Sequence, residues 1–298
     1  MAYPIVPAAY GLKPVSLSGG RVYAGSTRLI PIASNYGYNM FDGDVVTASG
    51  GSLVVTTLGA ASSPVAGTIG VFVGSQYVNS MSQTVRAQFY AANTITNTLY
   101  GPNSLQGYVV DDPYAVFQAA VLTQSTSVSN TPGATIGYVN PSFIGSNMYL
   151  VTNGSNGGSA SGSTATGDSA MGLTGGAITS GTQGNTRVTS SAPFRVVNVV
   201  PDTAVTVTAV GSTSGSSSTL TLTAANTAIS PGMQLIIPGV TGALASNFLT
   251  VTNVSTTTVT LSASITVASG TALSFIGYPE VQVQWNFGYH GYLNATAA

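Results

Sequence analysis

The chain alternates apolar and polar positions in short segments that are separated by turn residues. The alternation is clearest over residues 280–286, where Val281, Val283 and Trp285 share one face and polar side chains occupy the other. Because residues two positions apart lie on the same face of a strand, this pattern is typical of a half-buried β-strand. Residues 194–200 have a similar composition, so we expect them to form its partner strand.

Further strands are expected along the first 122 residues. Val, Thr, Ile and Tyr dominate these segments, and Gly, Ser, Asn and Pro interrupt them about every eight to twelve residues. This spacing is typical of a β-sandwich or a β-barrel, and no long helix is indicated. The expected strands are 21–23, 28–32, 43–46, 52–57, 68–77, 84–90, 107–110 and 116–122. The sequence therefore predicts an all-β, mostly antiparallel main domain.

Two stretches depart from this pattern. Residues 150–183 are rich in Gly, Ser, Ala and Thr, contain Asp168 as their only charged residue and show no sustained periodicity. We expect them to form a long loop or arm, which is ordered by its contacts with neighbouring chains. Residues 204–274 contain no charged side chain and alternate Thr with aliphatic residues in two similar halves, which predicts a small β-sandwich-like domain.

The position of this small domain indicates how it is attached. Without it, residues 199–202 would lie next to residues 277–280, which is a credible hairpin connection between two good strands. Insertions at exposed loop tips are well tolerated because the entering and leaving chain ends lie close together. We therefore expect residues 204–276 to be inserted into a hairpin of a main domain that comprises residues 1–203 and 277–298.

Composition narrows the class of protein. Only 4% of the residues are charged, against about 25% in an ordinary soluble domain. There is no cysteine for disulfides or thiolate metal sites, and a net charge of −1 offers no basic surface for nucleic acid or an anionic membrane. No run of about 18 apolar residues occurs, and the N-terminal residues lack the positive charge of a signal peptide. These features favour a chain made in the cytoplasm that works as part of an assembly.

Few residues could carry out catalysis. The only histidine, His290, is more typical of a structural or interface residue than of a catalytic triad. The adjacent pair Asp111 and Asp112 precedes Pro113 and predicts either a turn, in which an Asp side chain bonds the backbone, or an interface salt bridge. Asp42 and Asp44 are a weak Ca²⁺ candidate. We expect no catalytic residue, no cofactor and no metal site.

Interface residues are easier to propose. The chain has only six basic residues, so each is expected to have a specific carboxylate or carbonyl partner. Tyrosine outnumbers phenylalanine, 15 to 9, which suits interfaces that are apolar with hydrogen bonds at their edge; core packing and carbohydrate stacking remain alternatives. The candidate interface residues are Arg21, Arg28, Asp111, Asp112, Arg195, Trp285, Tyr289 and His290.

Several motifs, in order, resemble a group of virion structural proteins from tailed bacteriophages of aquatic and cyanobacterial hosts. The motifs are residues 8–15, 19–28, 43–46, 70–74, 108–113, 195–201 and 279–286. The resemblance covers residues 1–202 and 278–294, and it implies a non-enzymatic cement or decoration protein on the phage head. It also implies the major capsid protein and further copies of this chain, as dimers or trimers, as partners, with no nucleic acid and no membrane.

Other functions stay open. The sandwich-like insert and the aromatic residues would suit a tail, fibre or glycan-binding receptor protein. A major capsid protein is a further alternative, although the long helix and charged surface typical of that class are not evident. A carbohydrate-active enzyme would have Asp111, Asp112 and Glu280 as its carboxylate candidates. An outer-membrane barrel is disfavoured by the irregular strand spacing and the missing signal peptide.

Overall fold

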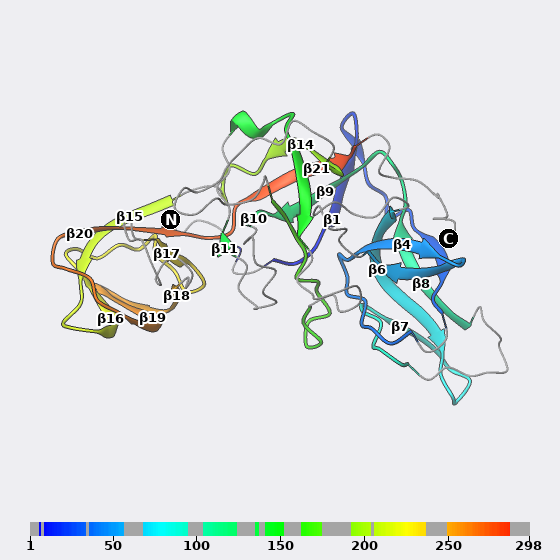
Figure 1. Ribbon diagram of the computed structural model, residues 1–298, viewed down its shortest axis with the longest axis horizontal. Helices are drawn as coiled ribbons and strands as arrows, with labels where there is room; N and C mark the ends of the chain where they lie inside the picture. The colour runs from blue at the N-terminus through cyan, green and yellow to red at the C-terminus, as the bar shows by residue number, and fades with distance from the viewer. Residues whose placement is uncertain are drawn as a thin grey trace.

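The fold is all-β, as the sequence predicts, and has three parts (Figure 1). A seven-stranded sheet lies in the middle of the long axis, a six-stranded sheet at one end and a closed six-stranded barrel at the other. This computed structural model describes residues 6, 9–33, 36–56, 68–94, 104–123, 135–136, 141–151, 162–174, 192–203, 206–236 and 249–286.

The seven-stranded sheet is built around the two strands whose pairing the sequence predicts. Val196 of β14 lies opposite Val283 of β21, and both strands are central in the sheet. In spatial order the strands are β13 (Gly172–Thr174), β12 (Asn147–Val151), β14 (Phe194–Val199), β21 (Glu280–Trp285), β9 (Ala115–Ala120), β1 (Lys13–Leu17) and β2 (Arg21–Val22).

The six-stranded sheet contains the strands expected between residues 28 and 110. Its spatial order is β3 (Arg28–Pro31), β8 (Leu105–Val110), β6 (Thr68–Val78), β4 (Val45–Ser49) and β5 (Ser52–Val55), while β7 (Thr84–Ala87) pairs with the far half of β6. A short ladder of β10 (Leu122–Thr123) and β11 (Thr135–Ile136) and a 3₁₀ turn (Pro141–Phe143) complete the main domain.

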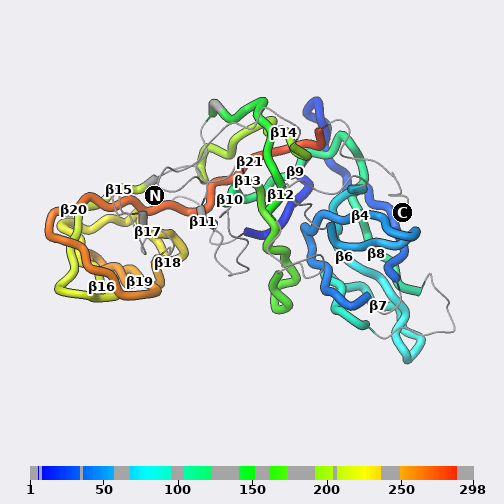
Figure 2. Tube along the Cα trace, in the orientation of Figure 1, coloured from blue at the N-terminus to red at the C-terminus, as the bar shows by residue number. Residues whose placement is uncertain are grey.

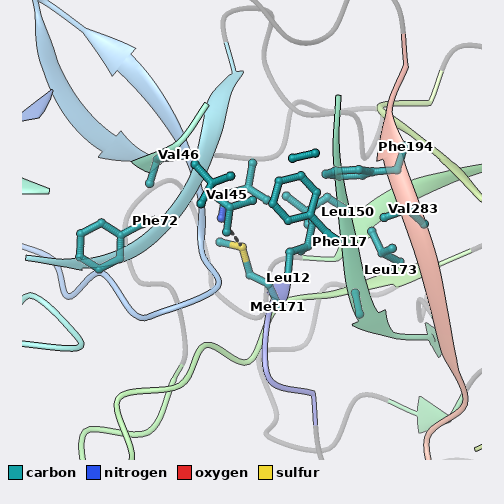
Figure 3. Packing of buried hydrophobic residues seen from close by; sticks show 14 of the residues in the cluster. Leu12, Val45, Val46, Phe72, Phe117, Leu150, Met171, Leu173, Phe194 and Val283 are labelled. Atoms are coloured by element: carbon teal, nitrogen blue, oxygen red, sulfur yellow. Dashed lines mark hydrogen bonds between the residues drawn. The ribbon is translucent and has the colours of Figure 1, made fainter. Parts of the chain in front are cut away.

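One continuous core joins the two sheets (Figure 3). Phe72 and Val45 from the six-stranded sheet and Phe117 and Phe194 from the seven-stranded sheet all belong to it. Trp285 is 5% exposed, and its ring lies 4.6 Å from that of Phe194 and 5.9 Å from that of Phe117. The alternating pattern of β21 therefore places its apolar face, including the tryptophan, in this core.

The described part of the glycine-rich segment differs from the expected loop. Residues 172–174 form β13, which pairs with β12. Asp42 and Asp168 form an isolated parallel β-bridge through their backbones. The Asp42 N–H donates to the Gly167 carbonyl at 2.9 Å, and the Ser169 N–H donates to the Asp42 carbonyl at 3.0 Å. Contacts within the same chain thus order residues 162–174; residues 152–161 and 175–183 lie outside the described part.

The inserted domain closes into a barrel instead of the expected sandwich. Its order is β15 (Thr206–Ser212), β16 (Ser217–Leu222), β19 (Thr258–Ile265), β18 (Leu249–Ser255), β17 (Gln234–Ile236) and β20 (Thr271–Ile276). Because β20 pairs with both β15 and β17, the last strand closes the ring. Phe275 is buried in a separate core whose other members are aliphatic side chains and a methionine.

Two antiparallel strand pairs, β14–β21 and β15–β20, connect the main domain to the barrel, and we call them the ribbon (Figure 2). The β14–β21 ladder ends with Val199 opposite Val281, and the β15–β20 ladder begins with Thr206 opposite Ile276. The junction has its own buried contacts, among them a 3.1 Å hydrogen bond from Gln234 Nε2 to the hydroxyl of Tyr278. The barrel is therefore seated on the main domain through packed and hydrogen-bonded residues.

Candidate functional site

Four of the expected interface residues converge at one end of the main domain, where β8 passes into β9 and the β1–β2 hairpin turns. Arg28 begins β3 opposite the end of β8, Asp111 and Asp112 follow β8, and Arg21 lies on β2. Four exposed apolar side chains come from the same elements. We call this set of eight residues the hairpin surface: Val15, Arg21, Val22, Arg28, Leu29, Asp111, Asp112 and Tyr114.

An ion pair fixes one side of the hairpin surface. Arg28 Nε lies 2.7 Å from Asp111 Oδ2, which is the kind of partner that the sequence predicts for an arginine in a chain with so few charges. The guanidinium is largely exposed, and exposed pairs of this kind contribute about 0–1 kcal/mol to stability. The pair therefore orients the first residue of β3 against the end of β8 more than it stabilises the fold.

Asp112 closes the turn that the sequence predicts at Pro113. Its Oδ1 accepts a hydrogen bond of 2.8 Å from the Tyr114 N–H, and its carbonyl accepts one of 3.0 Å from the Ala115 N–H. Asp side chains commonly close turns in this way. The turn positions the Tyr114 ring outward, where the residue is 61% exposed.

The β1–β2 hairpin is tied to this turn. The Ser18 N–H donates to the Tyr114 carbonyl at 2.7 Å, and Arg21 Nε donates to the Ser18 carbonyl at 3.4 Å. Gly19 and Gly20 have φ values of 82° and 75°, a region that side chains disfavour, so the tight turn depends on glycine. The hairpin and the Tyr114 turn thus form one ordered unit at the edge of the seven-stranded sheet.

The apolar part of the hairpin surface is unusually exposed. Val22 is 83% exposed, and Val15 and Leu29 are each more than two-fifths exposed. Exposed large apolar side chains, together with tyrosine and arginine, are typical of protein–protein contacts. The arrangement is suited to forming a largely apolar contact.

Two further expected interface residues lie elsewhere, and two lie outside the described residues. Arg195 is on β14, opposite Gln284, with its side chain exposed on the outer face of the seven-stranded sheet. Trp285 is in the core, where its indole packs between aromatic rings. Tyr289 and His290 are not among the described residues.

The three carboxylates considered for carbohydrate chemistry do not form a pair. Glu280 lies opposite Ala120, at one end of β9, whereas Asp111 and Asp112 precede Ala115 at the other end. Five residues of extended strand correspond to about 16 Å, and glycosidase carboxylates lie about 5–9.5 Å apart. Glu280 is also buried against the hydroxyl of Tyr10, so its position suits a structural contact.

The structure contains a second ionic cluster that no sequence pattern predicts. Lys13 Nζ lies 2.7 Å from Asp42 Oδ2 and 3.0 Å from Asp168 Oδ1, and Gln88 Nε2 donates to both carboxylates at 3.4 Å. It joins β1, the turn before β4 and the glycine-rich segment. Its two carboxylates lie 29 and 155 positions from Lys13, so no local pattern could reveal it.

Asp44 lies in the core beside this cluster. Its Oδ2 accepts a hydrogen bond of 2.8 Å from the Phe41 N–H, while its Oδ1 has no hydrogen-bond partner. Burial raises the pKa of this carboxyl to about 7, and the hydrogen bond from the Phe41 amide offsets part of that effect. Asp44 therefore changes its charge near neutral pH.

The weak Ca²⁺ candidate made of Asp42 and Asp44 does not gain ligands from the fold. Lys13 occupies the position beside Asp42 where a cation would bind. Within the described ranges, no group of three or more His, Cys, Asp or Glu residues is placed to hold a metal ion.

Comparison with protein-family models, curated proteins and solved structures finds no match to this chain. Of the helices in the described part, none has the length and apolar character needed to cross a membrane.

Proposed function

We propose that this chain is a non-enzymatic structural protein of a bacteriophage virion. It serves as a cement or decoration protein that binds the outer surface of the head in many copies and stabilises it. The observation that carries the proposal is the hairpin surface, where the same few elements present exposed apolar side chains and an arginine that is already paired. The ordered motifs that resemble phage virion proteins support the same role, with the major capsid protein and further copies as partners.

The hairpin surface has the properties that a permanent contact in a shell requires. A neighbouring subunit would cover Val22 and Tyr114, and burial of apolar area stabilises a contact by about 25 cal/mol per Å². Arg28 already has its carboxylate, so the contact needs no new ion pair on that side. Contacts of this kind depend little on ionic strength, because salt screens charges and leaves apolar burial intact.

The barrel suits the outward-facing part of such a protein. It lies at the far end of the long axis from the six-stranded sheet and is reached through the β14–β21 ribbon (Figure 1). Its sequence has no ionisable side chain between Ala204 and Gly277. In the proposed arrangement the main domain contacts the shell and the barrel faces solvent.

Purified phage particles test the proposal. Mass spectrometry of separated heads and tails should find the chain in heads at many copies. Adding the wild-type protein back to stripped heads should raise the temperature at which they release DNA. Val22→Asp should lower its occupancy, while Val210→Asp, on the exposed surface of the barrel, should not. Absence of the chain from heads, or unchanged head stability after stripping, would overturn the proposal.

A tail or fibre protein that binds a host glycan is the second candidate. The observation in its favour is a row of polar side chains on the outside of the barrel, where Thr219, Thr260 and Asn253 lie in register across β16, β19 and β18. Location of the chain on tails, together with binding of the full-length protein to host polysaccharide that Thr219→Val reduces, would establish this candidate in place of the first.

A further inference from the structure

The tip of the β6–β7 hairpin is held in a fixed shape by one side chain. Asn79 Oδ1 accepts hydrogen bonds of 3.0 Å from the N–H groups of Met81 and Gln83, and Asn79 Nδ2 donates to Gln83 Oε1 at 3.1 Å. Ser82 adopts a φ of 63°, which a non-glycine residue keeps only where its surroundings require it. The tip is thus ordered without a partner.

This ordered tip presents an apolar side chain to solvent. Met81 is 78% exposed and belongs to none of the buried clusters of the described residues. Methionine is unbranched and adaptable, and its sulfur packs well against aromatic rings. A group that is already held in place loses little conformational entropy on binding. Met81 therefore has the properties of an anchor for an apolar and aromatic surface.

The stem below the tip is also reinforced and carries a positive charge. Arg86 Nε and the Tyr108 hydroxyl both donate to Gln76 Oε1, at 3.0 and 2.7 Å, and the guanidinium lies 5.9 Å from the centre of the Tyr108 ring. In the described part of the chain no carboxylate pairs with Arg86. The hairpin therefore offers one apolar anchor and one cation without a counter-ion.

The hairpin surface supplies the matching groups. Tyr114 and Val22 provide the aromatic and apolar area for Met81. Asp112 uses Oδ1 to bond the Tyr114 N–H and has no cationic partner among the described residues, whereas Asp111 is already paired with Arg28. Asp112 is therefore the available carboxylate for Arg86. Arg21, also on this surface, donates through Nε to the carbonyl of its own turn.

The two surfaces cannot meet within one molecule. The β1–β2 hairpin, dark blue at the top of Figures 1 and 2, and the β6–β7 hairpin, cyan at the bottom right, lie at opposite ends of the main domain. We propose that the chain associates head to tail: the Met81 tip of one copy packs against Val22 and Tyr114 of the next, beside an Arg86–Asp112 ion pair.

Head-to-tail contact has a structural consequence. Because it joins two different surfaces, each added copy leaves one tip and one hairpin surface free, so the contact repeats and generates a ring or an open chain. This inference deepens the proposed function, since it assigns the hairpin surface to a second copy of the chain and rests on an assembly of many copies.

Cysteine cross-linking of the purified full chain tests the contact, because the natural sequence contains no cysteine. Met81→Cys and Val22→Cys proteins are prepared separately and oxidised gently, alone and mixed. We expect disulfide-linked dimers in the mixture and a ladder of higher species in the double variant, with monomers from each single variant. Val210→Cys, on the barrel, is the control and should not cross-link with either. Cross-linking of a single variant with itself, or none in the mixture, overturns the inference.

Sedimentation of unmodified protein gives a second measurement. Met81→Ser should weaken self-association about tenfold or more, as expected for loss of a central anchor, while Met81→Leu should retain it. A wild-type protein that stays monomeric at every concentration contradicts the inference. These results do not depend on phage particles: a chain found in heads that never cross-links refutes the head-to-tail contact alone, and a chain that cross-links but is absent from heads refutes the virion role alone.

Discussion

The main domain and the inserted barrel are stabilised by different means. The main domain combines an aromatic core with ion pairs and a fully buried carboxyl, whereas the barrel has a largely aliphatic core and no ionisable side chain. The ions of the main domain lie where distant segments meet: Lys13 holds a carboxylate 155 positions away. The comparison teaches that charge in the main domain fixes contacts between distant segments, whereas the barrel closes its ring, including the long-range β15–β20 pairing, without any ion.

Core substitutions should give the largest difference in stability between the two domains. Phe275→Ala should lower the free energy of unfolding of the barrel by about 3–5 kcal/mol, because it removes a buried ring and leaves a cavity. Phe194→Ala is the matched control and should affect only the main domain. Scanning calorimetry should show two transitions, each shifted by one variant. If either variant shifts both transitions equally, the two domains unfold as one unit and the comparison fails.

The second largest difference between the two domains should lie in how their stability depends on pH. The pKa of Asp44 is raised from its ordinary value of 3.8 to about 7, so the folded state favours the neutral carboxyl. That stabilisation is complete below pH 3.8 and is lost as the pH rises through 7, an effect of about 4 kcal/mol at most. Denaturant titrations between pH 4 and 8 should show this loss in the main domain.

The Asp44→Asn variant is the control for that measurement. In this variant the free energy of unfolding of the main domain should decline much less as the pH rises, since the amide does not ionise. The barrel transition should stay constant across the range, because residues 204–277 contain no titratable side chain. A barrel transition that follows the main domain would show that the junction transmits the effect.

The junction should give a smaller effect. Tyr278→Phe removes the acceptor of the 3.1 Å hydrogen bond from Gln234 Nε2, and both residues are buried. Leaving a buried donor without its acceptor costs about 1–3 kcal/mol, and we expect this loss in the barrel transition. Tyr38→Phe, on an exposed tyrosine of the main domain, should change neither transition. Equal effects of the two variants would rule out a specific role for the junction bond.

The Lys13 cluster should give the smallest effect. Lys13→Met should lower the stability of the main domain by at most about 1 kcal/mol, because its partners are partly exposed and screened by water. High salt should bring the wild type close to the variant. Arg195→Met, at an exposed arginine with no ion-pair partner in the described residues, is the control. If high salt also shifted the barrel transition, the salt effect could not be assigned to the Lys13 cluster.

The fold was largely predictable because its strands are defined by local patterns. The alternation over residues 280–286 predicted β21, its buried face and its pairing with β14. Closure of the inserted domain was not predictable, since it depends on β20 pairing with two strands at once. For the glycine-rich segment the sequence predicts a loop, because the segment has no periodic pattern of apolar residues.

In the structure some of those glycines are packing requirements. A Cβ on Gly162 would lie 2.3 Å from the Phe41 ring, and one on Gly172 would lie 2.5 Å from the Leu122 side chain. Sequence composition cannot distinguish a glycine chosen for close packing from one in a free loop. The sequence alone therefore does not predict the ordered structure of residues 162–174.

Half of the candidate interface was predictable for a related reason. Arg28, Asp111 and Asp112 stand out in a chain with few charges, and the turn at Pro113 follows from local chemistry. Trp285 was grouped with them because aromatic density suggested a contact surface, although its own strand pattern already placed it on the buried face. The Met81 tip gave no signal, since its order depends on the hydrogen bonds of Asn79.

The ribbon that carries the barrel also determines how the molecule responds to force. On the main-domain side it consists of β14 and β21, which are central in the seven-stranded sheet and bonded on their outer sides to β12 and β9. A pull on the barrel along the ribbon acts parallel to these strands and perpendicular to their inter-strand hydrogen bonds. Many bonds must then yield together instead of opening one by one. The insert is thus joined to strands that are hydrogen-bonded on both sides, so that a force on the barrel is spread over several strands of the sheet.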